Sequence, residues 1–171
     1  SNNEDFSSQY SSLPRNPFRL PLLESDEPIH SDYRNLLAPF FTPKRIGLLE
    51  QKARSLTIEL IAGFYAKGEC DFTSEFGQKM PIIILMSLLD LPSEDTPKLL
   101  QLSEEIVRGG MPEIIQAAFG KLGMYIATQV IPARRAAPGD DIFSALIAGT
   151  VEGGRPLSDE ELIAIGCLLI G

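Results

Sequence analysis

Apolar residues recur along most of the chain at spacings of three and four, which is the period of a helix with one buried face. Proline or a small polar residue stands where each apolar stripe begins, and such residues suit the first turn of a helix. The pattern therefore predicts a mainly α fold with about seven helices. Their expected starts lie near Pro28, Pro43, Asp71, Pro92, Pro112, Asp141 and Ser158.

Two of the expected helices carry long apolar stripes. The first begins after Thr42 and ends near Gly68, and we expect it to bury Ile46, Leu49, Ala53, Leu56, Leu60 and Phe64. The next is apolar on almost all sides from residue 82 to 89, so we expect it in the interior. Its predicted buried stripe is Phe72, Phe76, Met80, Ile83, Ile84 and Leu88.

The last part of the chain combines one turn signal with one strong helix start. Residues 150–155 contain two adjacent glycines and are the candidate for at most one small hairpin. Ser158 and Glu161 then have the spacing of a capping box. The helix that follows is apolar on most faces, so we expect other elements around it and a natural chain that continues past Gly171.

Composition narrows the class of protein. The chain has 171 residues, 44% of them hydrophobic and 22% charged, which suits one soluble domain with a core. Its formal charge of −8 argues against nucleic acid as a general partner. The uninterrupted apolar runs are too short to predict a membrane span. Cys70 and Cys167 have no paired spacing, which favours reduced thiols in a cytoplasmic protein.

The candidate for chemistry is His30 with Arg34. In a helix that we expect Asp26 to cap, the two side chains lie one turn apart on one face. An imidazole and a guanidinium at this spacing suit a bound pair of carboxylates. The alternative is a surface helix with a solvated arginine and a half-buried histidine. His30 is the only histidine, so the chain cannot form a His-rich metal site.

Several motifs stand in an order that resembles a known family. They are Asp26-x-Pro28-x-His30-x-x-x-Arg34, Phe41-Thr42-Pro43, Gly68-Glu69-Cys70-Asp71-Phe72, Leu91-Pro92-Ser93-Glu94-Asp95, Pro138-Gly139-Asp140-Asp141, and Leu157-Ser158-Asp159-Glu160-Glu161 running into Ile170-Gly171. Together they resemble the N-terminal-to-middle part of a soluble bacterial cytochrome P-450, from the loop before helix C to the first half of helix I. The camphor- and terpenoid-hydroxylating branch is the most similar.

The resemblance implies that residues 1–171 are part of a single cytochrome P-450 domain, without the half that carries the thiolate ligand. The cofactor would be haem b, iron protoporphyrin IX. His30 and Arg34 would bind its propionates, which agrees with the carboxylate site inferred from their spacing. The other residues implied to lie at the haem are Leu22, Leu23, Phe41, Cys167 and Gly171.

For the substrate pocket, the resemblance implies Phe18, Ile106, Val107 and Ile170. The alternative for these apolar residues is ordinary core packing. No catalytic residue and no metal ligand falls within the fragment, because the thiolate cysteine and the acid-alcohol pair of the family would lie beyond Gly171. Cys167 would lie within helix I and Cys70 at the start of helix E, so neither is expected to be that ligand.

The implied activity is that of a haem-thiolate monooxygenase. It would insert one oxygen atom from O₂ into a C–H bond of a small apolar substrate, a terpenoid or an aromatic compound, with electrons from NAD(P)H through a ferredoxin. The fragment alone would be inactive, and neither a membrane nor a nucleic acid would be a partner. The alternative function is that of a non-catalytic all-α ligand-binding or regulatory domain.

Overall fold

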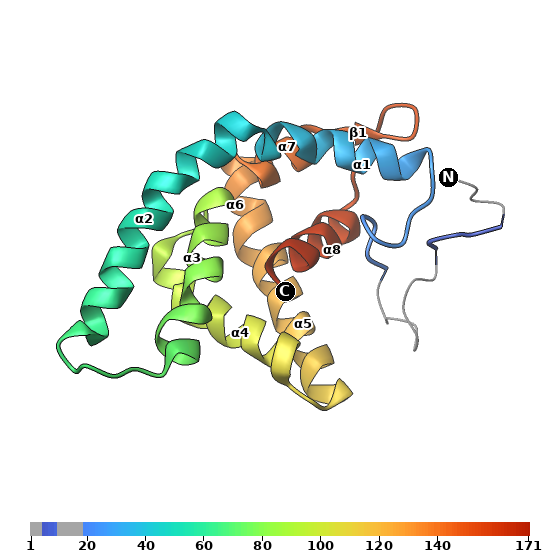
Figure 1. The fold of residues 1–171 in the computed structure, drawn as a ribbon. Coiled ribbons are helices and arrows are strands. Elements are labelled where there is room, and N and C mark those ends of the chain that lie inside the picture. The colour runs from blue at the N-terminus through green and yellow to red at the C-terminus, as the bar shows by residue number, and fades with distance from the viewer. Residues whose placement is uncertain (1–4, 10–18) are drawn as a thin grey trace.

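The computed structural model describes residues 5–9 and 19–171 of the chain, and these residues are mainly helical (Figure 1). The α-helices are α1 (Ile29–Leu37), α2 (Pro43–Tyr65), α3 (Lys79–Leu88), α4 (Thr96–Arg108), α5 (Pro112–Tyr125), α6 (Ile131–Ala136), α7 (Ile142–Ala148) and α8 (Asp159–Ile170). Shorter helical turns are η1 (Ala38–Phe41), η2 (Thr73–Gly77), η3 (Ser93–Asp95) and η4 (Ile126–Val130). Strands β1 (Thr150–Val151) and β2 (Arg155–Pro156) form one antiparallel hairpin.

Helices α5 and α6 are joined by the π-helical turn η4 into one continuous helix from Pro112 to Ala136. The turns η1, η2 and η3 likewise extend α1, α3 and α4. Counted this way, the described residues form seven helices and one two-stranded hairpin. The predicted mainly α class, with about seven helices and a small hairpin, is therefore confirmed.

The helix from Pro112 to Ala136 is also long and apolar enough to cross a membrane, by length and composition alone. The sequence prediction concerned uninterrupted apolar runs, and these remain short here because Glu113, Lys121 and Arg134 interrupt the helix. One such helix is weak evidence for a span. Leu122, Tyr125 and Ile126 are buried where this helix packs against α4 and α8, so we interpret it as a helix of the protein core.

Side-chain caps set several of the helix starts. The Thr42 hydroxyl accepts from the Arg45 amide at the start of α2, and Asp141 accepts from the Ser144 amide at the start of α7. Ser158 and Glu161 form the predicted capping box of α8. These three starts are confirmed. The cap assigned to Asp26 was wrong, because its carboxylate accepts from Ser7 and Ser8 instead.

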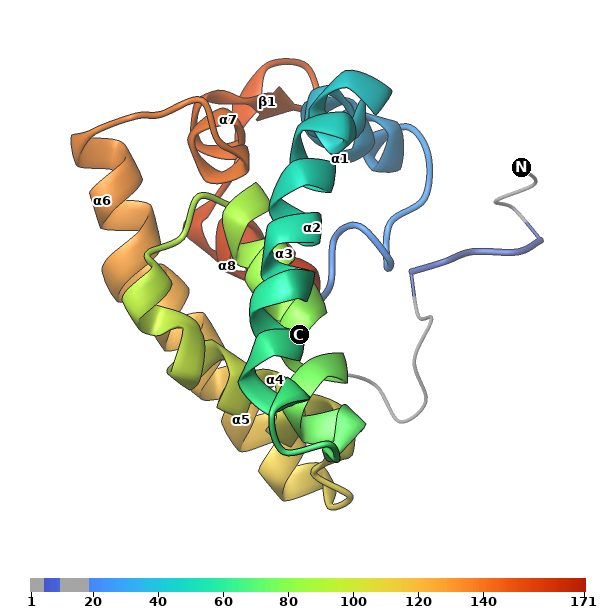
Figure 2. The same ribbon diagram turned by 60° about the vertical axis from the view of Figure 1, so that its left-hand side comes forward.

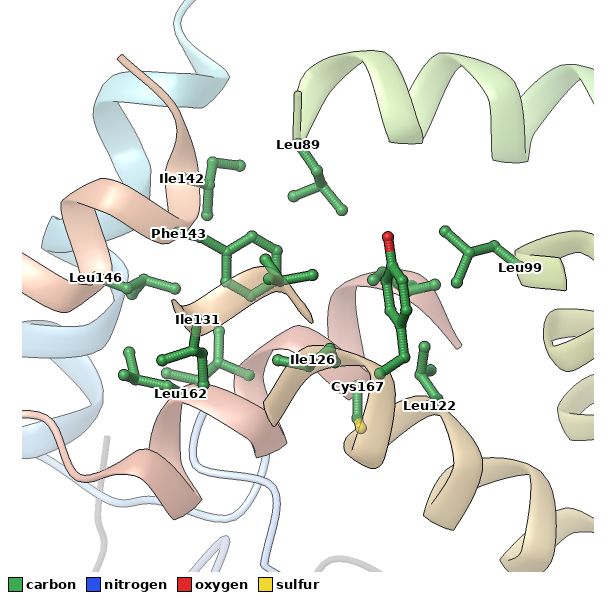
Figure 3. Close-up of a cluster of buried hydrophobic side chains, with 14 of the residues drawn as sticks. Leu89, Leu99, Leu122, Ile126, Ile131, Ile142, Phe143, Leu146, Leu162 and Cys167 are labelled. Carbon is green, nitrogen blue, oxygen red and sulfur yellow. The ribbon is translucent and has the colours of Figure 1, made fainter. Parts of the chain in front are cut away.

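The core gathers around α8 (Figure 1). Figure 3 shows Phe143 of α7 beside Ile142 and Leu146, with Ile131 of α6 nearby, and all four side chains are almost completely buried. Gly166 of α8 lies directly against this cluster. A Cβ atom added there would come within 2.9 Å of both Ile126 and Phe143, so only glycine permits this approach.

The predicted buried stripes of α2 and α3 were partly wrong. Of the six α2 positions only Leu56 is buried, because α2 lies along one edge of the described fold beside α3 (Figures 1 and 2). In α3 the buried residues are Ile82 and Met86, whereas Phe72 before it is exposed. A segment that is apolar all round has no periodic signal to select its buried face.

We predict unequal effects for the neighbouring carboxylates Asp140 and Asp141. Asp141 is buried, accepts from Ser144 Oγ at 2.6 Å and pairs with Arg134, whose Nε lies 3.1 Å from Asp141 Oδ2. Asp141→Ala removes the cap and leaves a largely buried guanidinium without that partner, at a cost of about 3 kcal/mol. Asp140→Ala should cost less than about 1 kcal/mol, because Asp140 is an exposed partner of Arg45.

Urea unfolding at neutral pH measures both changes. Equal destabilisation by the two substitutions would contradict a structural role for the buried carboxylate.

Candidate functional site

Helix α1 presents the predicted pair on one side. His30 is half-buried, and its Nδ1 lies 3.2 Å from Glu27 Oε1, so Nε2 is left as a second polar atom. Hydrogen bonds from Ser31 and His30 hold the pKa of the Glu27 carboxyl below its usual value. Arg34 is exposed and has no hydrogen-bond or ion-pair partner among the described residues. Its guanidinium is therefore available to an anion outside this part of the chain.

A second group of polar side chains joins α1 to the start of α8. The buried Tyr33 donates from its hydroxyl to Glu161 Oε1 at 2.5 Å. Arg155 of β2 donates to both oxygens of the same carboxylate, at 2.8 and 2.9 Å. The Ser158 amide adds a further donor at 2.7 Å. Glu161 thus connects α1, the hairpin and α8.

The charges of this network are fixed by its hydrogen bonds. The Arg155 guanidinium is the main cause that lowers the pKa of Glu161 to about 2, and Tyr33 adds to the effect. Burial raises the pKa of the Tyr33 phenol, and the Glu161 carboxylate raises it further. At neutral pH the network therefore holds a carboxylate, a guanidinium and a neutral phenol. Such groups suit recognition and positioning more than proton transfer.

Beside this network lies a cleft of about 1070 Å³. It is bounded by the segment before α1, by α1 itself, by α5 and by the first turns of α8. Figure 1 shows α8 between α1 and α5. Tyr33, Arg155 and Glu161 line it, and Cys167 forms part of its wall. Of the residues predicted for haem or substrate, Cys167 alone lies in this cleft among the described residues.

The other residues predicted to contact haem lie in different environments. Leu22 is partly buried and packs against the core, whereas Leu23 is 52% exposed and Phe41 is 46% exposed. Cys167 is only 2% exposed, and burial raises the pKa of its thiol to about 11. Gly171 is exposed. The exposed apolar side chains have surface available for contact, and the contact of these five residues with haem stays a prediction.

The predicted substrate residues separate into two groups. A Cβ atom added to Gly171 would lie 3.1 Å from Ile106 and 3.2 Å from Phe119, so α4, α5 and the end of α8 meet there. Ile106 and Ile170 are buried, as the core-packing alternative also expects. Val107, by contrast, is 68% exposed. Phe18 lies outside the described residues.

Sequence reasoning missed the Tyr33–Glu161–Arg155 network. The sequence predicts Glu161 only as part of a capping box and assigns Tyr33 no partner. The hydrogen bond between them joins residues that are 128 positions apart, and no local spacing signals such a contact. Among the described residues, no three His, Cys, Asp or Glu side chains gather as a metal site.

Comparison with known proteins gives similarity over almost the whole chain, although no protein-family model matches it. The chain is 31% identical to the Vitamin D(3) 25-hydroxylase of Pseudonocardia autotrophica, over 95% of this chain and 40% of that protein. It is 32% identical to a Steroid C26-monooxygenase of Mycolicibacterium smegmatis, over 99% of this chain and 44% of that protein.

Solved structures give the same result. The crystal structure of CYP101J2 aligns with a TM-score of 0.82 and 37% identity, over 99% of this chain and 43% of that one. A mutant of P450 EryK in complex with erythromycin B aligns with a TM-score of 0.79 and 27% identity, over 96% and 43%. The chain thus spans less than half the length of these relatives.

We predict that Glu161 contributes stability that depends on pH. Its folded pKa, about 2, is below its ordinary value of 4.5, so its contribution is complete above about pH 4.5 and is lost as the pH falls towards 2. Glu161→Gln should destabilise the protein by about 1–2 kcal/mol at pH 7, after allowance for the exposure of Arg155. The difference from the unchanged protein should shrink below pH 4.5.

Denaturant unfolding at pH 7 and pH 3 measures this difference. Glu160→Gln is the matched control, because Glu160 is an exposed neighbour in the same helical turn. A difference between the Glu161→Gln variant and the unchanged protein that stays constant across this pH range would contradict the assignment.

Proposed function

We propose that this chain, whose sequence and fold are similar to bacterial cytochromes P-450 over nearly its whole length, is part of a haem-thiolate monooxygenase. The family resemblance and the partial P-450 fold expected from the sequence are confirmed. The observation that carries the proposal is the alignment with CYP101J2, in which 99% of this chain takes the same fold at 37% identity. Relatives named as hydroxylases and monooxygenases give further support.

The proposed reaction inserts one oxygen atom from O₂ into a C–H bond of an apolar molecule. Haem b is the proposed cofactor, and NAD(P)H is the proposed electron source, through a redox partner of the ferredoxin type. We place the protein in the cytoplasm and residues 1–171 in a single domain of the longer protein. The length of the relatives supports the proposal that residues 1–171 are part of a longer protein, because this chain covers less than half of each relative.

For the substrate we propose a small apolar compound, a terpenoid or an aromatic. The support is the resemblance to terpenoid-hydroxylating enzymes and the apolar character of Ile106 and Ile170. Two relatives carry the names of larger polycyclic substrates, vitamin D(3) and a steroid. All of these compounds are apolar. The proposal of a small substrate is more specific than this shared property.

The residues present fit the carboxylate end of haem. Arg34 is an exposed guanidinium without a partner among the described residues, and His30 lies one turn before it on α1. Two propionates need two such donors, and an arginine fork gives short hydrogen bonds to a carboxylate. We propose that both residues hold propionates and that Leu22, Leu23 and Phe41 contribute apolar contacts.

The thiolate ligand is proposed to come from another part of the longer protein. Burial raises the pKa of the Cys167 thiol to about 11, so this thiol is neutral at physiological pH. Cys167 also lies within helix α8, whereas the resemblance places the ligand cysteine in a loop. Cys70 is exposed beyond the end of α2. When bound, the haem supplies the oxygen chemistry. The residues of this chain would bind and orient the haem, and the buried helix α8 would exclude water from the side of the haem that it covers.

We predict that the full-length protein is red and that its ferrous–CO complex has the red-shifted Soret band of a thiolate-ligated haem. Residues 1–171 alone should not give this band, because their two cysteines are unsuited to the ligand role. A full-length protein without the band would contradict the proposed function and favour a non-catalytic ligand-binding domain.

We predict that Arg34→Ala accelerates the loss of haem from the full-length protein to an acceptor globin. A charged hydrogen bond contributes roughly 1.5–3 kcal/mol, which corresponds to about 10–100-fold. His30→Ala should act in the same direction with a smaller effect, because a guanidinium offers a fork of donors and the imidazole does not. Arg54→Ala is the control, since Arg54 is an exposed partner of Glu50 on α2. Unchanged haem loss in Arg34→Ala would contradict the propionate assignment.

A further inference from the structure

The cleft beside the Tyr33–Glu161–Arg155 network has the size of a small-molecule site, about 1070 Å³, and Phe119 connects its wall to the place where Ile106 meets Gly171. We propose that this cleft binds an apolar ligand with a neutral or cationic end and discriminates against anionic ones. The inference rests on the proposed function, since it makes the cleft the place where a substrate first binds beside α8.

The wall of the cleft is apolar where it borders the helices. Phe119 of α5 and Ile163, Ala164 and Cys167 of α8 form this side, and Ile29 of α1 continues it. Because the Cys167 thiol is neutral, it acts here as a small apolar side chain. A hydrocarbon body would therefore replace water against these apolar side chains, which favours binding.

Two glycines of α5 mark a narrow and a wide part of the cleft. At Gly123 an added Cβ atom would come within 3.2 Å of Ile163, so α5 and α8 approach closely there. One turn earlier, at Gly120, an added Cβ atom would meet nothing within 4 Å. Both glycines line the cleft, so the space beside Gly120 is open to a ligand.

The charges around the cleft are predominantly negative. Its carboxylates are those of Asp26, Glu27, Glu152, Glu160 and Glu161. Arg19 and Arg155 are its guanidinium groups, and Arg155 is already bound to Glu161 and Glu152. Arg19 donates to the Glu24 carbonyl. Among the described residues of the cleft, five carboxylates therefore stand against two guanidinium groups. This excess of negative charge would repel an incoming carboxylate, whereas it would not repel an alcohol or an ammonium group.

The first test fills the cleft from Gly120. Gly120→Leu in the full-length holoprotein should leave the melting temperature unchanged or slightly higher, because leucine favours a helix more than glycine does. Binding of 1-decanol, measured by isothermal titration calorimetry, should weaken at least tenfold. Gly63→Leu is the matched control: Gly63 also lies in a helix with open space at its Cβ, but on α2, outside the cleft. Decanol binding to this control should not change.

The second test compares ligands that share one hydrocarbon chain. Decanol and decyltrimethylammonium should each bind at least tenfold more tightly than decanoate. Glu160→Gln should reduce the difference in affinity between decyltrimethylammonium and decanoate, because Glu160 is an exposed carboxylate of the cleft. Glu113→Gln is its control: Glu113 is also exposed in the first turn of a helix, but it lies outside the cleft.

Three results would overturn the inference. A large fall in the melting temperature of Gly120→Leu would mean that the longer protein packs its own residues into the cleft. Equal decanol affinity in Gly120→Leu and the unchanged protein would place the ligand elsewhere. Decanoate that binds as tightly as decanol would remove the charge discrimination. The ferrous–CO spectrum tests the proposed function separately, so a thiolate spectrum with no Gly120 effect would overturn this inference alone.

Discussion

Helix α8 is apolar on most faces, and it can be buried only where its neighbours approach it without leaving gaps. Small residues make this possible. Gly166 allows Ile126 and Phe143 to lie within contact of its backbone, and Gly123 allows α5 to come close to Ile163. A methyl group at either position would have to displace a neighbour. The positions of α5 and α7 around α8 thus depend on the absence of side chains as much as on the apolar ones present.

The charged first turn of α8 serves a different purpose from its apolar body. Glu161 completes the capping box, binds the fork of Arg155 and accepts the hydroxyl hydrogen of Tyr33. One carboxylate therefore fixes the start of α8 relative to the hairpin and to α1. Because α1 also carries His30 and Arg34, the position of the proposed propionate donors is linked to this contact.

Local signals in the sequence predicted much of the fold. Caps such as Ser158 with Glu161, and stops such as Gly68 after α2, act over one or two turns, so they could be recognised without tertiary structure. The faces of α2 and α3 could not be predicted in the same way. Which face is buried depends on the neighbour that covers it, and the single buried residue of α2, Leu56, reflects the edge position of that helix.

In the candidate site, too, features within one helical turn could be predicted from the sequence, whereas contacts between distant segments could not. The spacing of His30 and Arg34 was visible because one helical turn joins them, while the cleft was not, because it forms between α1, α5 and α8. Helix α1 shows how the two are related. Its period places Tyr33 and Leu37 against the fold and leaves Arg34 exposed. A single short helix therefore turns one face to the cleft and another towards a proposed cofactor, so a shift of α1 would alter both together.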